Sequence, residues 1–275
     1  MDTPIKLKYE KHINEDGIGL EWSTFYHPHI SPLHSHEFYE LELTLSGETE
    51  EYINGEKHIK KRGCVSILTP ADFHSYEVRD EISVAVLMFT EKCIPGGFVS
   101  QLFGRNVKRS VILSEEKTLA LEKLFSVLDS VKNYDKAFKD TLIKRLMDSI
   151  LLIILKEYYE KGHNIQSSKQ SDSEKAIQYI DLHFRDNPSV SDVSEIVGKS
   201  PDYFSKYFKK TTGYGFSEYL NKRKIECAEA LLKISDMSVT EICFNSGFES
   251  MSNFLRVFKN VTGTNPTSYR ERNKL

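Results

Sequence analysis

The sequence predicts an α+β multidomain protein, with a strand-rich barrel at the N-terminus, two helices after it and an all-α domain at the C-terminus. Three observations support this fold class. Short β-branched segments bounded by turn residues fill about the first 105 residues, apolar residues then recur at helical spacing, and one helical pattern occurs twice near the C-terminus. The chain has 275 residues, 39% of them hydrophobic, which is enough for two separate cores.

The N-terminal strands are indicated by their turns. Asn54-Gly55 lies between two short alternating runs, and this dipeptide supplies the two positive-φ positions of a tight hairpin. Segments 65–69 (VSILT) and 83–89 (SVAVLMF) are apolar, β-branched and bounded by Gly, Pro, Asp or Glu. Many short strands of this kind are typical of a barrel or sandwich, so we expect a barrel over about residues 1–105.

Two helices are expected next, from Glu115 to Asn133 and from about Lys136 to Tyr159, because apolar residues recur there at helical spacing. The last turns of the second helix, DSILLIILKEYY, are apolar around nearly the whole circumference. More than one neighbour must therefore cover this helix. We expect packing against the barrel, a homodimer contact, or both on different faces.

Residues 163–173 are polar and serine-rich, and they predict a linker between domains at 1–162 and 174–275. The second domain carries 15 Lys and Arg against 13 Asp and Glu, a net charge of +2, whereas the whole chain has −3. This mild basicity is only a weak indication of a nucleic-acid partner.

The composition argues against several classes of protein. The four cysteines are far apart and form no CxxC, so neither a zinc knuckle nor a disulfide framework is predicted. The segment MDTPIKLKYE lacks the apolar core of a signal peptide. The longest apolar run, 150–155, is too short to span a bilayer, so we expect a cytoplasmic protein with no membrane partner.

A helical pattern occurs twice in the C-terminal domain, beginning at Ser189 (SVSDVSEIVGKSPDYFSKYFKKTTG) and at Ser238 (SVTEICFNSGFESMSNFLRVFKNVTG). Each copy opens with Ser-x-x-Asp/Glu, which caps a short helix. A second helix then starts at Ser200-Pro201 in one copy and at Ser250 in the other. Each second helix has paired phenylalanines on one face and a glycine suited to its end: Phe204, Phe208 and Gly213, and Phe254, Phe258 and Gly263.

Each copy is thus a helix, a tight turn and a second helix that carries cations opposite its phenylalanines, which is the helix-turn-helix pattern. Two ordinary helical hairpins with solvated lysines are the simpler interpretation, but matched caps, phenylalanines and cations in two copies argue against it. Segment 216–233 predicts one connecting helix of about 27 Å at 1.5 Å per residue. Such a helix can fix the distance between two recognition helices so that they enter successive major grooves, about 34 Å apart.

From Glu174 onward the chain resembles the AraC/XylS family of bacterial transcription regulators. The most specific stretch runs from Gly247 through Arg270 and includes Gly263, Pro266 and Tyr269. The resemblance implies a double helix-turn-helix domain that binds double-stranded promoter DNA. The first copy matches less closely, as is usual in the family, because that helix reads the variable half-site.

The resemblance also implies which residues touch DNA. Base contacts would come from Asp202, Ser205, Lys206, Ser252, Asn253 and Arg256. Arginine and lysine can donate to guanine and asparagine can pair with adenine, whereas an aspartate should face cytosine N4 or solvent. Phosphate contacts position a protein on DNA without selecting a base sequence. Here they would come from Lys209, Lys210, Lys222, Arg223 and Lys259, with Lys224 beside them.

The segment HSHEFYELELTLSG has the spacing His34-x-His36-x₃-Glu40-x₆-Gly47, and His74 follows later. This resembles the cupin β-barrel, in which two histidines and a carboxylate of one motif join a histidine of the next. The resemblance implies one shared site, and three histidines with one carboxylate suit Zn, Fe, Mn or Ni. On a regular strand the two early histidines and the carboxylate would share one face.

Three interpretations of these four residues remain. The favoured one is a metal-free pocket for an organic effector. A divalent metal site is less favoured, because Asp72 replaces the usual Gly of the second cupin motif and the spacing there is one residue longer. Plain surface is the third, since Glu42 and Thr44 share the parity of Glu40.

Together these features predict a transcription regulator rather than an enzyme, with no catalytic residues and no required cofactor. The cupin-like barrel would bind a small-molecule effector, a sugar or related metabolite by family analogy alone, and helices 115–160 would form a homodimer. RNA polymerase is a further partner if the protein is an activator. The alternative is a cupin metalloenzyme, of the dioxygenase or isomerase type, with a helical appendage.

Overall fold

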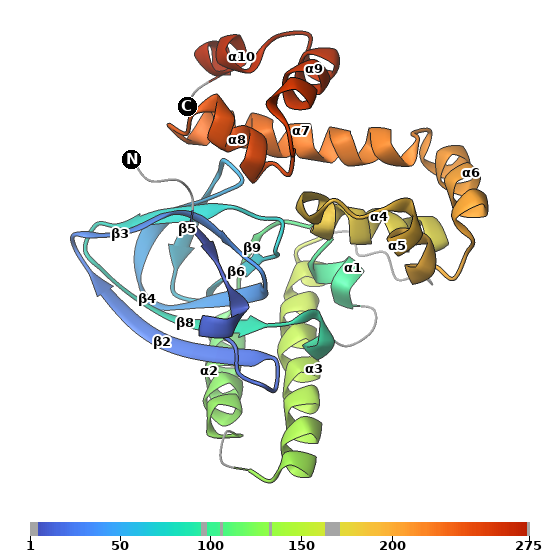
Figure 1. Cartoon of the computed structure of the whole chain (residues 1–275). Coiled ribbons are helices and arrows are strands. Elements are labelled where there is room, and N and C mark those ends of the chain that lie inside the picture. Colours follow the sequence, from blue (N-terminus) through green and yellow to red (C-terminus); the bar gives the residue numbers. More distant parts are fainter. Residues whose placement is uncertain (1–4, 95–97, 105–106, 132–133, 163–170, 274–275) are drawn as a thin grey trace. The chain divides into compact units, whose positions relative to one another are not determined.

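The computed structural model describes residues 5–94, 98–104, 107–131, 134–162 and 171–273 (Figure 1). The chain divides into two compact units, Ile5–Ser167 and a second unit that contains Ser168–Leu275. Of the expected linker, residues 163–170 lie outside the described residues. The remainder belongs to a helix, because α4 (Asp172–His183) begins at Asp172, with the Ser171 side chain as its N-cap.

A single sheet of nine strands forms most of the first unit, and β4 (Tyr39–Ile53) organises it. The first half of β4 pairs antiparallel with β6 (Cys64–Leu68) and β8 (Glu81–Phe89). Its second half pairs with β5 (Glu56–Lys61) and β7 (His74–Val78). The other strands are β1 (Ile5–Leu7), β2 (Ile18–Tyr26), β3 (His29–His36) and β9 (Ser110–Ile112).

Figure 1 shows these strands curving around one interior. The sheet is an open barrel in the described residues, since no pairing closes the path from β1 to β9. The predicted hairpin is confirmed between β4 and β5, where Asn54 and Gly55 have φ values of 50° and 85°.

Both faces of the first half of β4 are buried, which corrects one expectation. Glu42 and Thr44 are 2% and 0% exposed, so the interpretation of this strand face as plain surface is wrong. On the opposite face, Tyr39 packs against Phe89 and Phe103, with ring centroids 5.8 and 4.9 Å away. The apolar face therefore belongs to the core, and the polar face lines the barrel interior.

Helices α1 (Phe98–Leu102), α2 (Glu115–Ser130) and α3 (Lys136–Glu160) complete the first unit. α2 contacts α3 and β8, and α3 also contacts β9, so the expected packing against the barrel is confirmed. Among the described residues of α3, Met147, Ile150, Leu151, Ile154 and Tyr158 are fully buried. Single 3₁₀ turns lie at η1 (Tyr9–Lys11), η2 (Glu91–Cys93) and η4 (Phe184–Asp186).

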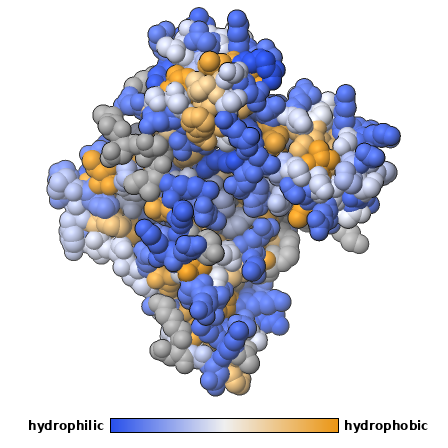
Figure 2. All heavy atoms as spheres, viewed as in Figure 1, coloured by the Kyte–Doolittle hydropathy of each residue, from blue (hydrophilic) through white to orange (hydrophobic). Residues whose placement is uncertain are grey.

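No helix in the described part of the chain combines the length and the apolar character needed to cross a membrane. On the face shown in Figure 2, hydrophilic residues dominate and apolar residues gather only in small groups. Scattered apolar side chains of this kind are normal on protein surfaces.

The second unit is all helical and contains two similar helix-turn-helix pairs, α5–α6 and α8–α9, joined by α7. Its helices after α4 are α5 (Val190–Ile196), α6 (Pro201–Thr212), α7 (Phe216–Ile234), α8 (Val239–Asn245), α9 (Met251–Thr262) and α10 (Pro266–Asn273). The paired phenylalanines Phe204, Phe208, Phe254 and Phe258 are all fully buried.

The local signals that predicted these helices are confirmed. Ser189 and Ser238 form capping boxes at the starts of α5 and α8. Ser200 and Ser250 accept hydrogen bonds from backbone amides at the starts of α6 and α9. Both second helices end at a left-handed glycine, Gly213 with φ 79° and Gly263 with φ 75°.

A partly buried polar contact joins the two helix-turn-helix pairs. The ammonium of Lys224 on α7 donates to Oδ1 of Asn187, and Nδ2 of Asn187 donates to the carbonyl of Gly247, 3.2 Å away. Gly247 has φ 87°, and a Cβ there would lie 2.8 Å from Cα of Arg185. Only glycine permits this approach of the α8–α9 turn to the segment before α5.

Candidate functional site

The starts of α6 and α9 present the polar faces expected for contacts with bases. Asp202, Ser252, Asn253 and Arg256 are exposed, as is Lys206. In α9, Nη2 of Arg256 donates to Oδ1 of Asn253 at 2.8 Å, so these two side chains lie together. Ser205 is half-buried and its hydroxyl donates to the carbonyl of Pro201 at 2.9 Å.

Tyr203 and Leu255 also project from these two helices and were not singled out from the sequence. Their side chains are 55% and 41% exposed. Both directly neighbour residues that the family resemblance indicated. The residues expected to contact bases were polar or charged ones, whereas thymine methyl groups are recognised by apolar contact, which an aromatic ring or a leucine can supply.

The expected phosphate contacts separate into two groups. Lys209, Lys210 and Lys259 are exposed, and Lys222 is half-buried, with its ammonium 4.8 Å from the ring centre of Tyr214. In contrast, the Arg223 side chain is only 14% exposed, with Nε 2.6 Å from the Asp181 carboxylate and Nη1 paired with Glu226. The structure therefore does not support a phosphate role for Arg223.

Lys224 also has its partner inside the helical unit, since it is 5% exposed and hydrogen-bonded to Asn187. Its ammonium lies 5.3 Å from the ring centre of Phe248. Burial lowers the pKa of this ammonium. Lys224 is therefore unavailable to DNA phosphates, contrary to the sequence-based expectation.

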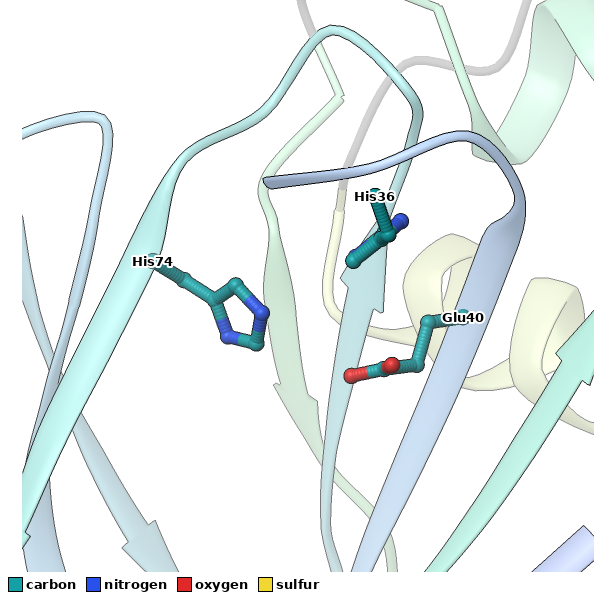
Figure 3. Close-up of side chains that lie close together, drawn as sticks. All are labelled: His36, Glu40 and His74. Carbon is teal, nitrogen blue, oxygen red and sulfur yellow. The ribbon is translucent and has the colours of Figure 1, made fainter. Parts of the chain in front are cut away.

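The barrel brings together three of its four predicted residues. Side-chain ligand atoms of His36, Glu40 and His74 lie within 4.8 Å of one another (Figure 3). His36 ends β3, Glu40 lies near the start of β4 and His74 begins β7, so three strands converge here. The chain leaves strand geometry between β3 and β4, so the assumption of one regular strand was wrong. The side chains of His36 and Glu40 still reach the same interior.

His34 lies beside this group rather than in it. Its ring centroid is 4.1 Å from that of His74, and its Nδ1 is 2.8 Å from the carbonyl of Pro32. Burial and the neighbouring His74 lower the pKa of His34 to about 3, so this imidazole is neutral. Burial and His74 likewise hold the pKa of His36 well below its usual value.

A second set of buried charges supports the three residues. The ammonium of Lys60 lies 2.6 Å from Oε2 of Glu42 and 3.5 Å from Oε1 of Glu51. Glu51 also accepts from Ser66 Oγ at 2.5 Å and lies 3.2 Å from Nδ1 of His74. None of these charged side chains is more than 3% exposed.

These surroundings set opposite pKa shifts on the carboxylates. Burial raises the pKa of Glu40 to about 7. Burial would also raise that of Glu51, but Lys60, His74 and Ser66 together lower it to about 2. Burial opposes the charge on Lys60, yet Glu42 and Glu51 raise its pKa. The barrel interior therefore holds a fixed Glu51 carboxylate beside a Glu40 that ionises near neutrality.

Glu51 and Lys60 were missed at the sequence level, although a signal existed. The Asn54-Gly55 turn fixes the hairpin register, in which Glu51 opposes His58 and Lys60 opposes Thr49. Since side chains alternate along a strand, this register puts both charges on one face. The pattern did not reveal that this face is buried.

Two family models match the chain. One describes an AraC-like ligand-binding domain and covers residues 19–145, and the other describes a helix-turn-helix domain and covers residues 193–272. An uncharacterised helix-turn-helix transcriptional regulator of Staphylococcus aureus is 34% identical over 234 residues, which are 83% of this chain and 31% of that protein. The chain thus spans about a third of the length of such relatives.

Two further proteins are similar over a smaller part of the chain. The regulatory protein PocR of Salmonella typhimurium is 33% identical over 138 residues, which are 50% of this chain and 46% of that protein. The C-terminal domain of AraT, a response regulator from Geobacillus stearothermophilus, is 30% identical. It covers 39% of this chain and 91% of its own, with a TM-score of 0.37.

The two matches place an AraC-like ligand-binding domain and a helix-turn-helix domain in one chain. The chain belongs to the AraC family of transcriptional regulators. The resemblance carried by Gly247 through Arg270 is thereby confirmed.

The buried Lys60 predicts a large stability effect. Lys60→Met leaves Glu42 and Glu51 buried without their counter-ion, and such losses cost about 3–5 kcal/mol. Lys57→Met is the matched control, because Lys57 is 51% exposed in its 2.7 Å pair with Glu50 and exposed pairs contribute at most about 1 kcal/mol. Urea unfolding followed by fluorescence of Trp22, the single tryptophan, measures both. Equal effects of the two substitutions would contradict the role given to Lys60.

Proposed function

We propose that this protein regulates transcription by binding promoter DNA through α6 and α9 in response to a small molecule bound in the barrel. The observation that carries the proposal is the duplicated helix-turn-helix, in which both second helices bury a phenylalanine pair and expose cations on the other face. Simple core packing requires the phenylalanines but gives no reason for matched cations.

The start of α9 would read bases through Arg256 and Asn253. An arginine can donate to guanine O6 and N7, and an asparagine can pair with adenine N6 and N7. Because Arg256 donates to Asn253 in the free protein, the two side chains are already oriented as one unit. The hydroxyl of Ser252 can bond to either kind of base.

The start of α6 would read a different half-site. Lys206 can donate to guanine, and Asp202 can accept from cytosine N4. The hydroxyl of Ser205 is the third candidate of this helix. Phosphate contacts would come from the exposed cations Lys209, Lys210 and Lys259 and from the half-buried Lys222.

The barrel would hold the effector against His34, His36, Glu40 and His74. A polar and charged interior favours a ligand that donates and accepts hydrogen bonds or coordinates a cation, rather than an apolar one. Binding regulates only if the effector has a higher affinity for one arrangement of the two units than for the other. The metalloenzyme alternative leaves the duplicated cations without a role.

The base-reading role of Arg256 is tested on DNA selected from a random pool. Arg256→Ala should cost about 1–3 kcal/mol at one half-site and relax the base preference there. Lys259→Ala is the matched control, and it should weaken binding to all sequences and lower the salt slope by about one. Electrophoretic mobility shifts on substituted half-sites measure both. A uniform loss for Arg256→Ala would assign this residue to phosphate instead.

A second copy of the chain is the proposed partner of α3. Phe138, Leu152 and Tyr159 recur at multiples of seven residues, which is nearly whole helical turns, and are 71%, 54% and 71% exposed. Apolar side chains along one helical line favour a helix–helix contact. RNA polymerase is a further partner only if the protein activates transcription.

Leu152→Glu should therefore weaken self-association at least tenfold, because a charge would be buried in the contact. Tyr26→Glu, at an exposed aromatic residue on β2, should leave association unchanged. Sedimentation equilibrium of the full chain measures both variants. A wild-type chain that stays monomeric at all concentrations contradicts this contact.

A further inference from the structure

We propose that the barrel binds one divalent transition-metal ion through Nε2 of His36, Nε2 of His74 and the carboxylate of Glu40, with Glu51 as the positioning residue of His74. The inference deepens the proposed function, because it names the ligand class of the effector site. It rests on the described geometry of the barrel and on the chemistry of its side chains.

The three residues converge from different strands onto one point, as Figure 3 shows. Their ligand atoms lie within 4.8 Å of one another. Ligand atoms around a tetrahedral ion with bonds near 2.1 Å are about 3.4 Å apart, so small side-chain rotations bring the group into range. His36 and His74 are 0% and 1% exposed, and Glu40 is 6% exposed.

The hydrogen bonds of both histidines leave the same nitrogen available. Nδ1 of His36 lies 2.6 Å from the carbonyl of Phe38, and Nδ1 of His74 lies 3.2 Å from the carboxylate of Glu51. Because these oxygens can only accept, each Nδ1 carries a proton, and a ring without a second proton presents a lone pair at Nε2. Metal-binding histidines are oriented in this way by a carbonyl or carboxylate behind them.

Both Nε2 atoms are buried and have no hydrogen-bond partner among the residues that the structure describes. Leaving a buried polar atom unsatisfied costs roughly 1–3 kcal/mol. Two such atoms point to a missing ligand, and an ion bound between them would satisfy both. A proton at Nε2 of His74 is the competing occupant, because burial opposes it but Glu51 and Glu40 raise the pKa of this ring.

Glu51 is held in place independently of any ion. Ser66 donates to its Oε2, and Lys60 and His74 lie next to its Oε1. Lys60 is itself fixed by Glu42. The carboxylate can therefore orient the His74 ring without reorganising when the ion binds, which is the usual role of such outer groups.

The donor set determines which ions fit. Two imidazole nitrogens and one carboxylate suit Zn, Ni, Co or Fe, whereas Ca²⁺ and Mg²⁺ prefer sites made of oxygen ligands. Three protein ligands leave at least one coordination position on the ion. A small molecule with a carboxylate, hydroxyl or amine donor can occupy that position, which would join the metal to the proposed effector.

The test uses the full chain, prepared without a histidine tag and freed of metal with a chelator. Co²⁺ is titrated while its visible absorption is recorded, and Zn²⁺ affinity follows by competition. We expect one ion per chain, with affinity falling at least 100-fold in His36→Gln and His74→Gln. Glu51→Gln should keep the stoichiometry, lower the affinity about 10–100-fold and shift the Co²⁺ spectrum, because it weakens the hydrogen bond that orients His74 and removes a negative charge beside the ion.

Two histidine variants serve as controls, and Trp22 fluorescence checks that every variant is folded. His58→Ala should bind as the wild type does, although His58 also has a bonded Nδ1 and an unpaired Nε2, since no other described ligand converges on it. His34→Ala should lose far less affinity than His36→Gln. An equal loss would overturn the three-ligand assignment.

Failure of this inference is separable from failure of the proposed function. A wild-type chain that binds neither Co²⁺ nor Zn²⁺ at micromolar concentration overturns the metal site. Unchanged binding in both His36→Gln and His74→Gln overturns it as well. DNA binding by the metal-free chain is measured separately, so a protein that binds its selected DNA but no ion loses only the metal inference.

Discussion

The contact among Lys224, Asn187 and Gly247 is the constraint on which the proposed DNA-reading arrangement depends. It ties the middle of α7 to the segment before α5 and to the turn between α8 and α9. A connecting helix alone fixes distance, but it leaves each end free to tilt. The partly buried contact and the close approach of Gly247 to Arg185 also fix how the two pairs face each other. α6 and α9 are thereby held as one reading surface.

In the barrel, the notable polar contacts do not serve to hold the fold together. Its polar interior contributes little to stability, because burying charges costs desolvation that their pairing only partly offsets. An apolar interior of the same volume would often be as stable or more so. The network of Glu42, Glu51, Lys60 and His74 therefore supports the proposal that the barrel binds a ligand. The apolar face of β4, around Tyr39, supplies the packing that keeps this interior in place.

Local signals in the sequence predicted most of the fold, including both helix-turn-helix pairs. Caps, paired phenylalanines and the Asn54-Gly55 turn act over a few residues, so they could be recognised without knowing the tertiary structure. The burial of Arg223 and Lys224 could not be recognised in this way, because their partners Asp181 and Asn187 lie more than thirty residues away along the chain. A row of cations on a helix does not show which of them face the solvent.

The barrel shows the same limit. Alternation along β4 indicated which side chains share a face, but it did not indicate that both faces are covered. For this reason Glu42 could be interpreted as a solvent-exposed residue, and its buried partner Lys60 was overlooked. The four candidate residues came from the family-like spacing, whereas the exclusion of His34 depends on the positions of the ligand atoms, since those of His36, Glu40 and His74 lie within 4.8 Å of one another.

The central claim is that one rigid unit reads two sites on DNA. Selection of bound sequences from a random pool, with the full chain at physiological salt, tests it most directly. The account predicts two conserved half-sites whose centres lie about 10–10.5 base pairs apart, because α6 and α9 must enter successive major grooves on one face of the DNA. A single half-site, or two half-sites at variable spacing, would contradict it.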